Sequence, residues 1–215
     1  MLDPNELWFK QKCYTSEGPY LLPFAPNINW KSASVFIVGL NPTGSFRDEF
    51  DSFEHYWQAL TRHPDTYKKI HQEKYLRRPE SRTSKRIRYL TEWLDPVNVL
   101  VTNTFAYPTT NPLFIPTHIR REPVGERLLS RLLRTCKPKV VFFHGAEARK
   151  FGEAFFGVKL NPYLEPSRQP VIRCIPDTDS VSSLFAYHHL VGRVETKDVT
   201  DMKLRQFAER ILQRV

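Results

Sequence analysis

The chain has 215 residues, enough for one compact domain with a buried core. Its apolar share of 40% and charged share of 26% are typical of a soluble globular protein and exclude a disordered chain. The formal net charge of +9 favours a polyanionic partner, and nucleic acid is the commonest polyanion of the cytoplasm. A basic protein that is merely soluble is the alternative.

Several classes of protein are disfavoured by what the sequence lacks. The 3 cysteines are scattered without a Cys-x-x-Cys pair, which argues against a disulfide framework and against a metal site made of thiolates alone. Residues 1–10 contain acids and no long apolar run, unlike a signal peptide. No stretch approaches the roughly 20 apolar residues of a membrane span. We therefore expect no membrane association and a cytoplasmic location, in the bacterial cytoplasm or with the nucleoid.

Apolar runs rich in β-branched residues predict the strands. They are Ser34–Leu40, Val97–Phe105, Lys139–His144 and a fourth region that holds Val171–Ile175 and Leu184–Tyr187. The runs are continuous rather than alternating, as a central parallel sheet covered on both faces requires.

Helical patterns lie between and after these runs. From Pro123, one face carries Val124, Leu128, Leu129, Leu132, Leu133 and Cys136. Residues 146–156 predict a short helix, and residues 198–214 a final one with the stripe Leu204, Phe207, Ala208, Ile211, Leu212 and Val215. The alternation predicts an α/β fold, a three-layer α/β/α sandwich around a mainly parallel four-stranded sheet. We expect a single domain over 1–215, with its core at about 34–193.

The segment 62–88 is basic and contains interleaved tyrosines. Its cations outnumber its acids, and Tyr67 and Tyr75 lie among them, with Tyr89 directly after. Cations neutralise phosphates and aromatic rings stack on unpaired bases, so we expect Lys85 and Arg86 to contact DNA. A solvated pair of helices whose tyrosines face the core would produce the same pattern.

Polar residues follow three strands at the edge where such sheets bind ligands. The segments are 39–45 (Gly-Leu-Asn-Pro-Thr-Gly-Ser), 102–105 (Thr-Asn-Thr-Phe) and 187–193 (Tyr-His-His-Leu-Val-Gly-Arg). The loop at Gly44 lacks the Gly-Lys-Ser/Thr ending of a P-loop, which excludes that motif.

The order of these segments resembles that of the uracil-DNA glycosylase superfamily. The superfamily has a strand ending Gly-x-(Asp/Asn)-Pro, then a strand ending in a base-reading Asn, then a late loop containing His. Asn41 makes the first motif most similar to the mismatch-specific and single-strand-selective branches. Residues 138–148 also resemble the third strand and following helix, so the likeness spans about residues 34–193.

The resemblance implies a role for each matched residue. Asn41 would orient the attacking water by hydrogen bonding, because an amide cannot accept a proton as a carboxylate does. Asn103 would read the Watson–Crick edge of uracil, in a base pocket that includes Gly39 and Leu40. Phe53, chosen over Phe46 and Phe50, would stack on the base. Each role has a structural alternative: Asn41 could be a turn residue, Asn103 a buried polar residue, and the three phenylalanines part of the core.

The late loop supplies the remaining expected roles. His189, or else His188, would hydrogen-bond the pyrimidine O2, although Leu190 and the residues after it depart from the family's usual His-Pro run. Arg193 would then fill the space left by the flipped base, and Ser45 would contact DNA. A histidine pair could also suggest a metal site, but the sequence has no third ligand at a spacing from the pair that is typical of such sites. With 3 cysteines, a four-cysteine iron–sulfur cluster is not expected, and we expect no cofactor.

Together these features predict a monomeric, monofunctional DNA glycosylase of base-excision repair. It would hydrolyse the N-glycosidic bond of uracil, or of a related deaminated base, flipped out of DNA. A glycosylase fold that binds nucleic acid or nucleotides without cleaving them is the main alternative. An enzyme acting on free nucleosides or nucleotides is a weaker one, because a small substrate needs no basic segment.

Overall fold

The apolar runs fold into a parallel sheet in the computed structural model. The structure describes residues 3–44, 46–75, 80–160, 181, 183–187, 190 and 197–215, and for residues 197–200 it describes only the helical backbone. The strands are β1 (Val35–Gly39), β2 (Val99–Asn103), β3 (Val140–His144) and β4 (Ser183–Tyr187). They form a four-stranded sheet in the order β2-β1-β3-β4, and every neighbouring pair is parallel. This confirms the predicted α/β fold.

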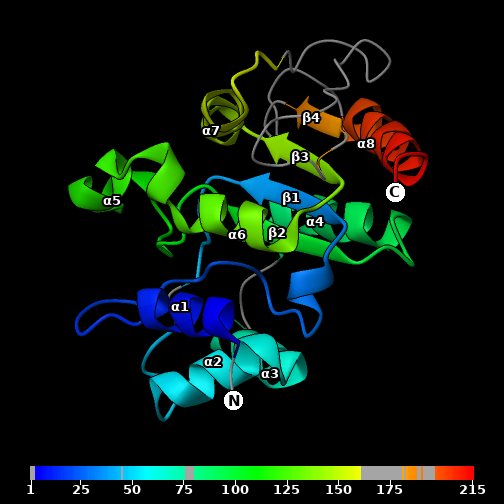
Figure 1. Ribbon diagram of the computed structural model, residues 1–215. Helices are drawn as coiled ribbons and strands as arrows, with labels where there is room; N and C mark the ends of the chain where they lie inside the picture. The colour runs from blue at the N-terminus through cyan, green and yellow to red at the C-terminus, as the bar shows by residue number, and fades with distance from the viewer. Residues whose placement is uncertain are drawn as a thin grey trace.

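Helices cover both faces of the sheet, which is why its strands are mainly apolar between their ends. On one face Ile37, Phe142 and Phe185 pack against α4 (Arg82–Trp93) and α8 (Lys197–Leu212). On the other, Val38, Val141 and Phe143 pack against α6 (Leu128–Cys136) and α7 (Ala146–Phe156). The three layers are visible in Figure 1. α7 has the predicted bounds, and α8 corresponds to the predicted final helix.

The segment from Pro123 folds differently from the single helix predicted there. It forms a short 3-10 helix, η3 (Val124–Glu126), and α6 begins only at Leu128. The two are separated because Arg127 has extended backbone, with φ −60° and ψ 149°. The Arg127 guanidinium donates hydrogen bonds to the carbonyl oxygens of Glu122 and Arg120, at 3.1 and 3.3 Å. These bonds hold the interruption in place.

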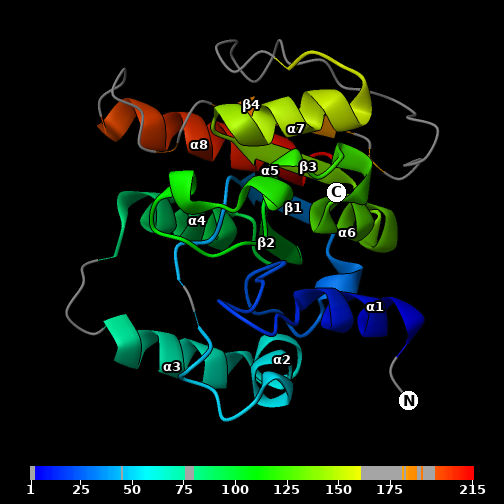
Figure 2. The same ribbon diagram turned by 90° about the vertical axis from the view of Figure 1, so that its left-hand side faces the viewer.

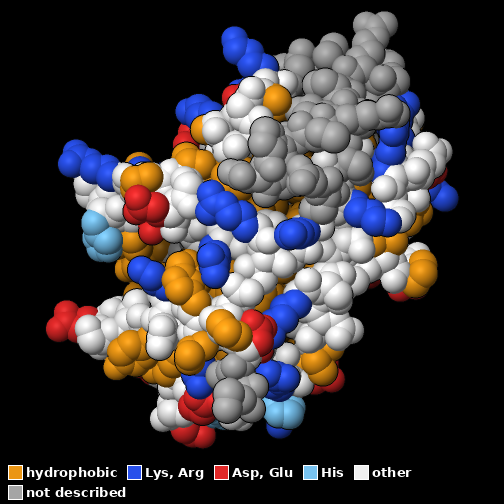
Figure 3. Space-filling model, in the orientation of Figure 1, with side chains coloured by type: hydrophobic (Ala, Val, Ile, Leu, Met, Phe, Trp, Pro, Cys, Tyr) orange, Lys and Arg blue, Asp and Glu red, His pale blue; other side chains and the backbone are white. Residues whose placement is uncertain are grey.

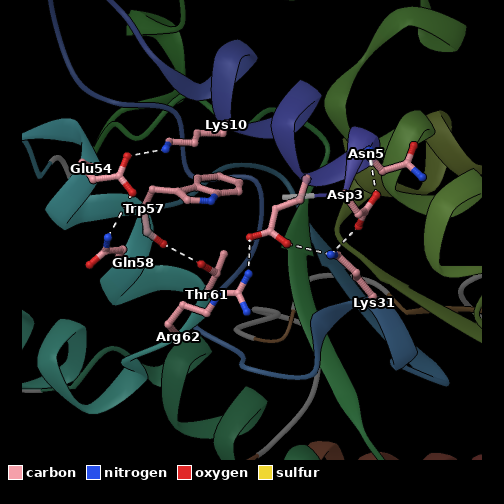
Figure 4. A network of polar contacts seen from close by, with 10 residues as sticks. Asp3, Asn5, Lys10, Lys31, Glu54, Trp57, Gln58, Thr61 and Arg62 are labelled. Atoms are coloured by element: carbon pink, nitrogen blue, oxygen red, sulfur yellow. Dashed lines mark hydrogen bonds and ion pairs between the residues drawn. The ribbon is translucent and has the colours of Figure 1, made fainter. Parts of the chain in front are cut away.

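Three further helices extend the layer beyond α6. They are α1 (Pro4–Cys13), α2 (Phe53–Thr61) and α3 (Pro64–Tyr75), and Figures 1 and 2 show them together on the side of α6 away from α7. The Glu6 carboxylate of α1 is 97% buried and joins α1 to the end of α2, since it accepts hydrogen bonds from Lys31 Nζ at 2.7 Å and from Arg62 Nη2, directly after α2, at 2.8 Å. Figure 4 shows this network between α1, η1 (Trp30–Ser32) and α2.

The basic segment becomes α3 and α4. Tyr67 is buried among Phe46, Phe50 and Tyr56, as the core-facing alternative predicted. Tyr89 instead lies half-buried on α4, 5.9 Å from Trp93 between ring centroids, with Lys85 and Arg88 over its ring. The tyrosines of this segment therefore do not share one environment.

Residues 171–175, which carry part of the predicted fourth strand region, lie outside the described residues. Of the helices in the described parts of the chain, none combines the length and apolar character that crossing a membrane requires.

Candidate functional site

The carboxyl ends of the parallel strands gather at one edge of the sheet. In Figure 1 the strand arrows point toward this edge, where α5 (Thr117–Arg121) and the start of α7 lie. Figure 2 looks onto it. Because β1 occupies the interior of the sheet, the residues after it lie between those that end β2 and β3. This is the edge at which open α/β sheets bind their ligands.

Gly39 ends β1 between two polar side chains. A Cβ at this position would lie 2.8 Å from Asn103 Oδ1 and 2.9 Å from His144 Nε2. Asn103 ends β2 in register with Gly39, and His144 ends β3. The missing side chain of Gly39 thus lets an amide and an imidazole approach the β1 backbone from both sides, so two predicted residues, Gly39 and Asn103, are brought together.

His144 is a site candidate that the sequence reasoning did not select. His144 is 94% buried and stands at the carboxyl end of an apolar run, as Asn103 does. That position was the available signal, because strand ends were already the suspected ligand edge. His144 also pairs in register with Tyr187, the last residue of β4.

Asn41 has its side chain fixed by two backbone oxygens. Its Nδ2 donates to Thr109 O at 2.8 Å and to Pro42 O at 2.9 Å. Both acceptors are carbonyl groups, so the orientation of the amide is unambiguous. Among the residues that the structure describes, none donates a hydrogen bond to Asn41 Oδ1. The half-buried amide therefore presents an acceptor oxygen.

A hollow of about 300 Å³ opens at this edge beside Leu40. Phe105 and Arg127 form part of its wall, with the Arg127 guanidinium 4.6 Å from the centre of the Phe105 ring. Burial lowers the pKa of Arg127 from its ordinary value. A larger hollow of about 610 Å³ shares Phe105 and Arg127 and also contains Glu122, whose pKa is raised by burial. Both hollows contain partly desolvated charge next to an aromatic ring.

Phe53 is not brought to this edge. It begins α2 and packs against Tyr20, Tyr56 and Trp57, with ring centroids 5.0, 5.9 and 6.4 Å away. Phe46 and Phe50 are buried in the adjoining core around Tyr67. All three predicted stacking candidates thus have aromatic partners within the protein, as the core alternative requires.

Lys85 and Arg86 lie near the start of α4 in different environments. Lys85 is exposed, with its Nζ 5.6 Å from the centre of the Tyr89 ring. Arg86 is mostly buried, donates to Asp201 Oδ1 at 3.0 Å, and also donates to Leu190 O. Lys85 is therefore presented to solvent, whereas Arg86 joins α4 to α8.

The other predicted residues, Ser45, His188, His189 and Arg193, lie outside the described residues. His188 directly follows Tyr187 in the sequence, so the predicted histidine pair begins where β4 ends. Within the described ranges, no three His, Cys, Asp or Glu side chains gather as a bound metal ion would require.

Two sequence comparisons with known proteins add no relative. No model of a known protein family matches the sequence. A search of curated proteins finds no match either. The fold and the arrangement of residues at the sheet edge are therefore the basis for assigning a function.

Proposed function

We propose that the protein is a DNA glycosylase that releases uracil, or a related deaminated base, from DNA. The observation that carries the proposal is the placement of Asn103 and His144 on either side of Gly39, with Asn41 two residues beyond Gly39. The three polar side chains belong to adjacent strand ends. Asn41 and Asn103 follow the order of the superfamily that the sequence resembles, whereas His144 has no counterpart among the motifs compared. The net charge of +9 suits a DNA substrate.

Asn41 would orient the water in this reaction. Hydrolysis of an N-glycosidic bond needs a water molecule held below C1′ of the sugar while the bond to the base breaks. With both N–H groups of Asn41 used by backbone carbonyls, its Oδ1 can accept a hydrogen bond from that water. An amide does not remove the proton, so the rate must depend more on stabilising the departing base.

Asn103 and His144 would contact the base. The Asn103 amide has both donors and an acceptor, which suit the N3–H and O4 of uracil. His144 places a ring nitrogen close to the same glycine, so its imidazole would lie beside the base in a site that burial makes less polar. The charge that develops on O2 would be stabilised by His189 or His188, as the resemblance implies.

A protein that binds DNA without cleaving it is the second candidate. Leu190 stands in a histidine-containing loop that departs from the family's usual run, and Asn41 cannot act as a base. If these departures abolish turnover, the protein should hold uracil-containing DNA tightly and form no abasic product.

Release of free base from defined oligonucleotides tests the proposal. The wild-type protein should form alkali-labile abasic sites in DNA containing uracil, hypoxanthine or xanthine. Removal of one transition-state hydrogen bond commonly costs about 10²–10³ in kcat, which is the loss expected for Asn41→Ala and His189→Ala. Lys139→Ala at the amino end of β3 is the matched control and should leave the rate unchanged. No abasic product at high enzyme concentration would refute the assignment.

A further inference from the structure

The larger hollow, of about 610 Å³, is not used by the proposed chemistry. Its wall contains none of the residues that carry the proposed site, which are Gly39, Asn41, Asn103 and His144. Its volume lies within the range of sites that bind small organic molecules, which is about 300–1,000 Å³. The larger hollow is therefore a candidate site for a ligand of its own.

Glu122 presents a carboxylate to the larger hollow. The residue directly follows α5 and is half-buried, and burial raises the pKa of its carboxyl group. Arg127 and Lys12 act on this carboxylate through their charge, but within the described ranges no side chain forms a hydrogen bond or ion pair with it. A carboxylate that has lost part of its water needs donors in exchange. A ligand with N–H groups would supply them.

Arg127 and Phe105 give the wall a planar surface. The Arg127 guanidinium lies 4.6 Å from the centre of the Phe105 ring, and its Nε and Nη2 donate to two carbonyl oxygens. Its Nη1 donates to no residue that the structure describes. Leu21 and Ile119 add apolar surface. The hollow thus combines an aromatic ring, a free donor and a free acceptor, as recognition of a planar heterocycle requires.

Charged side chains of both signs surround the larger hollow. Lys12, His118 and Arg121 line it and are exposed, and so are the acids Glu17 and Glu126. Figure 3 shows basic, acidic and histidine side chains beside hydrophobic ones over the part of the surface that α5 occupies in Figure 1. Because acids and bases are mixed, the hollow is not complementary to a bare anion. It is complementary to a ligand that carries both an anionic group and N–H donors.

We propose that the larger hollow binds a guanine nucleotide, with Glu122 accepting hydrogen bonds from the base and the exposed basic side chains contacting the phosphate. Guanine has two adjacent donors, N1–H and the N2 amino group, which match the two oxygens of one carboxylate. Adenine and cytosine have a ring-nitrogen acceptor beside the amino group, and uracil has one N–H between two carbonyl oxygens. A carboxylate therefore selects guanine. The Phe105 ring would stack on the base, and Lys12 and Arg121 would donate to the phosphate.

Isothermal titration calorimetry of the full chain with GMP tests the proposal. The wild-type protein should bind GMP at least about tenfold more tightly than AMP or CMP. Glu122→Gln keeps the size of the side chain and removes a half-buried charge, so it should stay folded, and it should lose about 10- to 100-fold in affinity for GMP. Glu147→Gln is the matched control, because Glu147 lines only the smaller hollow, and it should bind as wild type. Absence of GMP binding, or equal affinity for AMP, would overturn the proposal.

Guanosine tests the placement of the phosphate. Lys12→Ala/Arg121→Ala should weaken GMP binding by about tenfold and leave guanosine binding unchanged, because guanosine has no phosphate. Equal losses for both ligands would overturn that placement.

A variant of the proposed site separates the two functions. Asn103→Ala should leave GMP binding unchanged, because Asn103 does not line the larger hollow. Loss of GMP binding in this variant would place the nucleotide in the candidate site and overturn the proposal. Calorimetry does not require base release, so the nucleotide site does not fail if the protein is no glycosylase. Absence of GMP binding would likewise leave the proposed function intact.

Discussion

Replacement of Gly39 by alanine tests the close approach at the centre of the candidate site. The new Cβ would lie 2.8 Å from Asn103 Oδ1, 2.9 Å from His144 Nε2 and 3.1 Å from His144 Cε1. These separations are several tenths of an ångström shorter than ordinary contacts, so both side chains must move. Asn103 is half-buried and can turn toward solvent, whereas the buried His144 is held by its surroundings.

The size of the effect follows from this geometry. Insertion of a methyl group into a packed region typically costs about 1–3 kcal/mol, so the free energy of unfolding of Gly39→Ala should fall by about that amount. The effect on activity should be larger in proportion, because a displacement of about 1 Å in a positioning group can cost about 10²-fold in rate. We expect a loss in kcat/KM for uracil release that the loss of stability does not account for.

Two other glycines provide matched controls. At Gly152 a Cβ would lie 2.7 Å from the Phe143 ring, so Gly152→Ala should also be destabilised but should keep its activity while folded. At Gly125 the nearest atom is Arg134 Nη2 at 3.7 Å, so Gly125→Ala should change neither property. Urea unfolding and initial rates at a temperature where all variants are folded provide the comparison. If Gly39→Ala retains the activity of Gly152→Ala, Asn103 and His144 do not form the site.

The remaining predictions concern charge. Burial alone would raise the pKa of Glu6, but hydrogen bonds from Lys31 and Arg62 lower it below its ordinary value of 4.5. The stability that these bonds contribute is complete above that value and is lost as pH falls through the lower pKa of the folded state. The urea midpoint of wild type should therefore show an additional loss at acid pH that the midpoint of Glu6→Gln does not show. Lys85→Ala should reduce the slope of log Kd for DNA against log salt concentration by about 1 without changing stability, whereas an unchanged slope would remove Lys85 from the interface. Arg86→Ala should cost about 1–3 kcal/mol in urea unfolding and speed amide exchange in α8, because Asp201 and the Leu190 carbonyl lose their donor.

The sheet was predictable because its strands are buried on both faces. Such strands have continuous apolar runs, and the runs around Val38, Leu100 and Phe142 identified three of them to within two residues at each end. Helix α7 was predicted with its observed bounds, and in the structure Gly145 and Gly157, both with positive φ, stand at its two ends.

Helix α1 had no such signal. Its buried residues are Glu6, Phe9 and Cys13, which have helical spacing but begin with a charged residue. A search for apolar periodicity does not count a glutamate as part of the buried face. Glu6 can be buried only because Lys31 and Arg62 reach it from distant parts of the chain, and a local pattern cannot contain that information.

The candidate site was predictable where strand ends determine it. Asn103 and Gly39 meet because parallel strands in register bring their carboxyl ends together. Phe53 was selected, within the stretch after Asn41, because it lies close in sequence to Tyr56 and Trp57, but α2 packs it into the aromatic cluster with Tyr20 and Tyr56. Loop length gives no direction in space, so spacing alone could not place this side chain.

The anchoring of Asn41 has a consequence for how the sequence can change. The carbonyl oxygens of Pro42 and Thr109 and the N–H of Thr109 belong to the main chain, so substitutions at those two positions leave the bonding groups present. Three hydrogen bonds are involved, from Asn41 Nδ2 to Pro42 O, from Asn41 Nδ2 to Thr109 O, and from Thr109 N–H to Pro42 O, and only the Asn41 amide among these groups belongs to a side chain. Homologues could therefore differ at residue 109, except to proline, which lacks the N–H, and still keep these bonds. A change at Asn41 would remove the bonds of its amide and leave the bond from Thr109 N–H to Pro42 O as the link between the two loops.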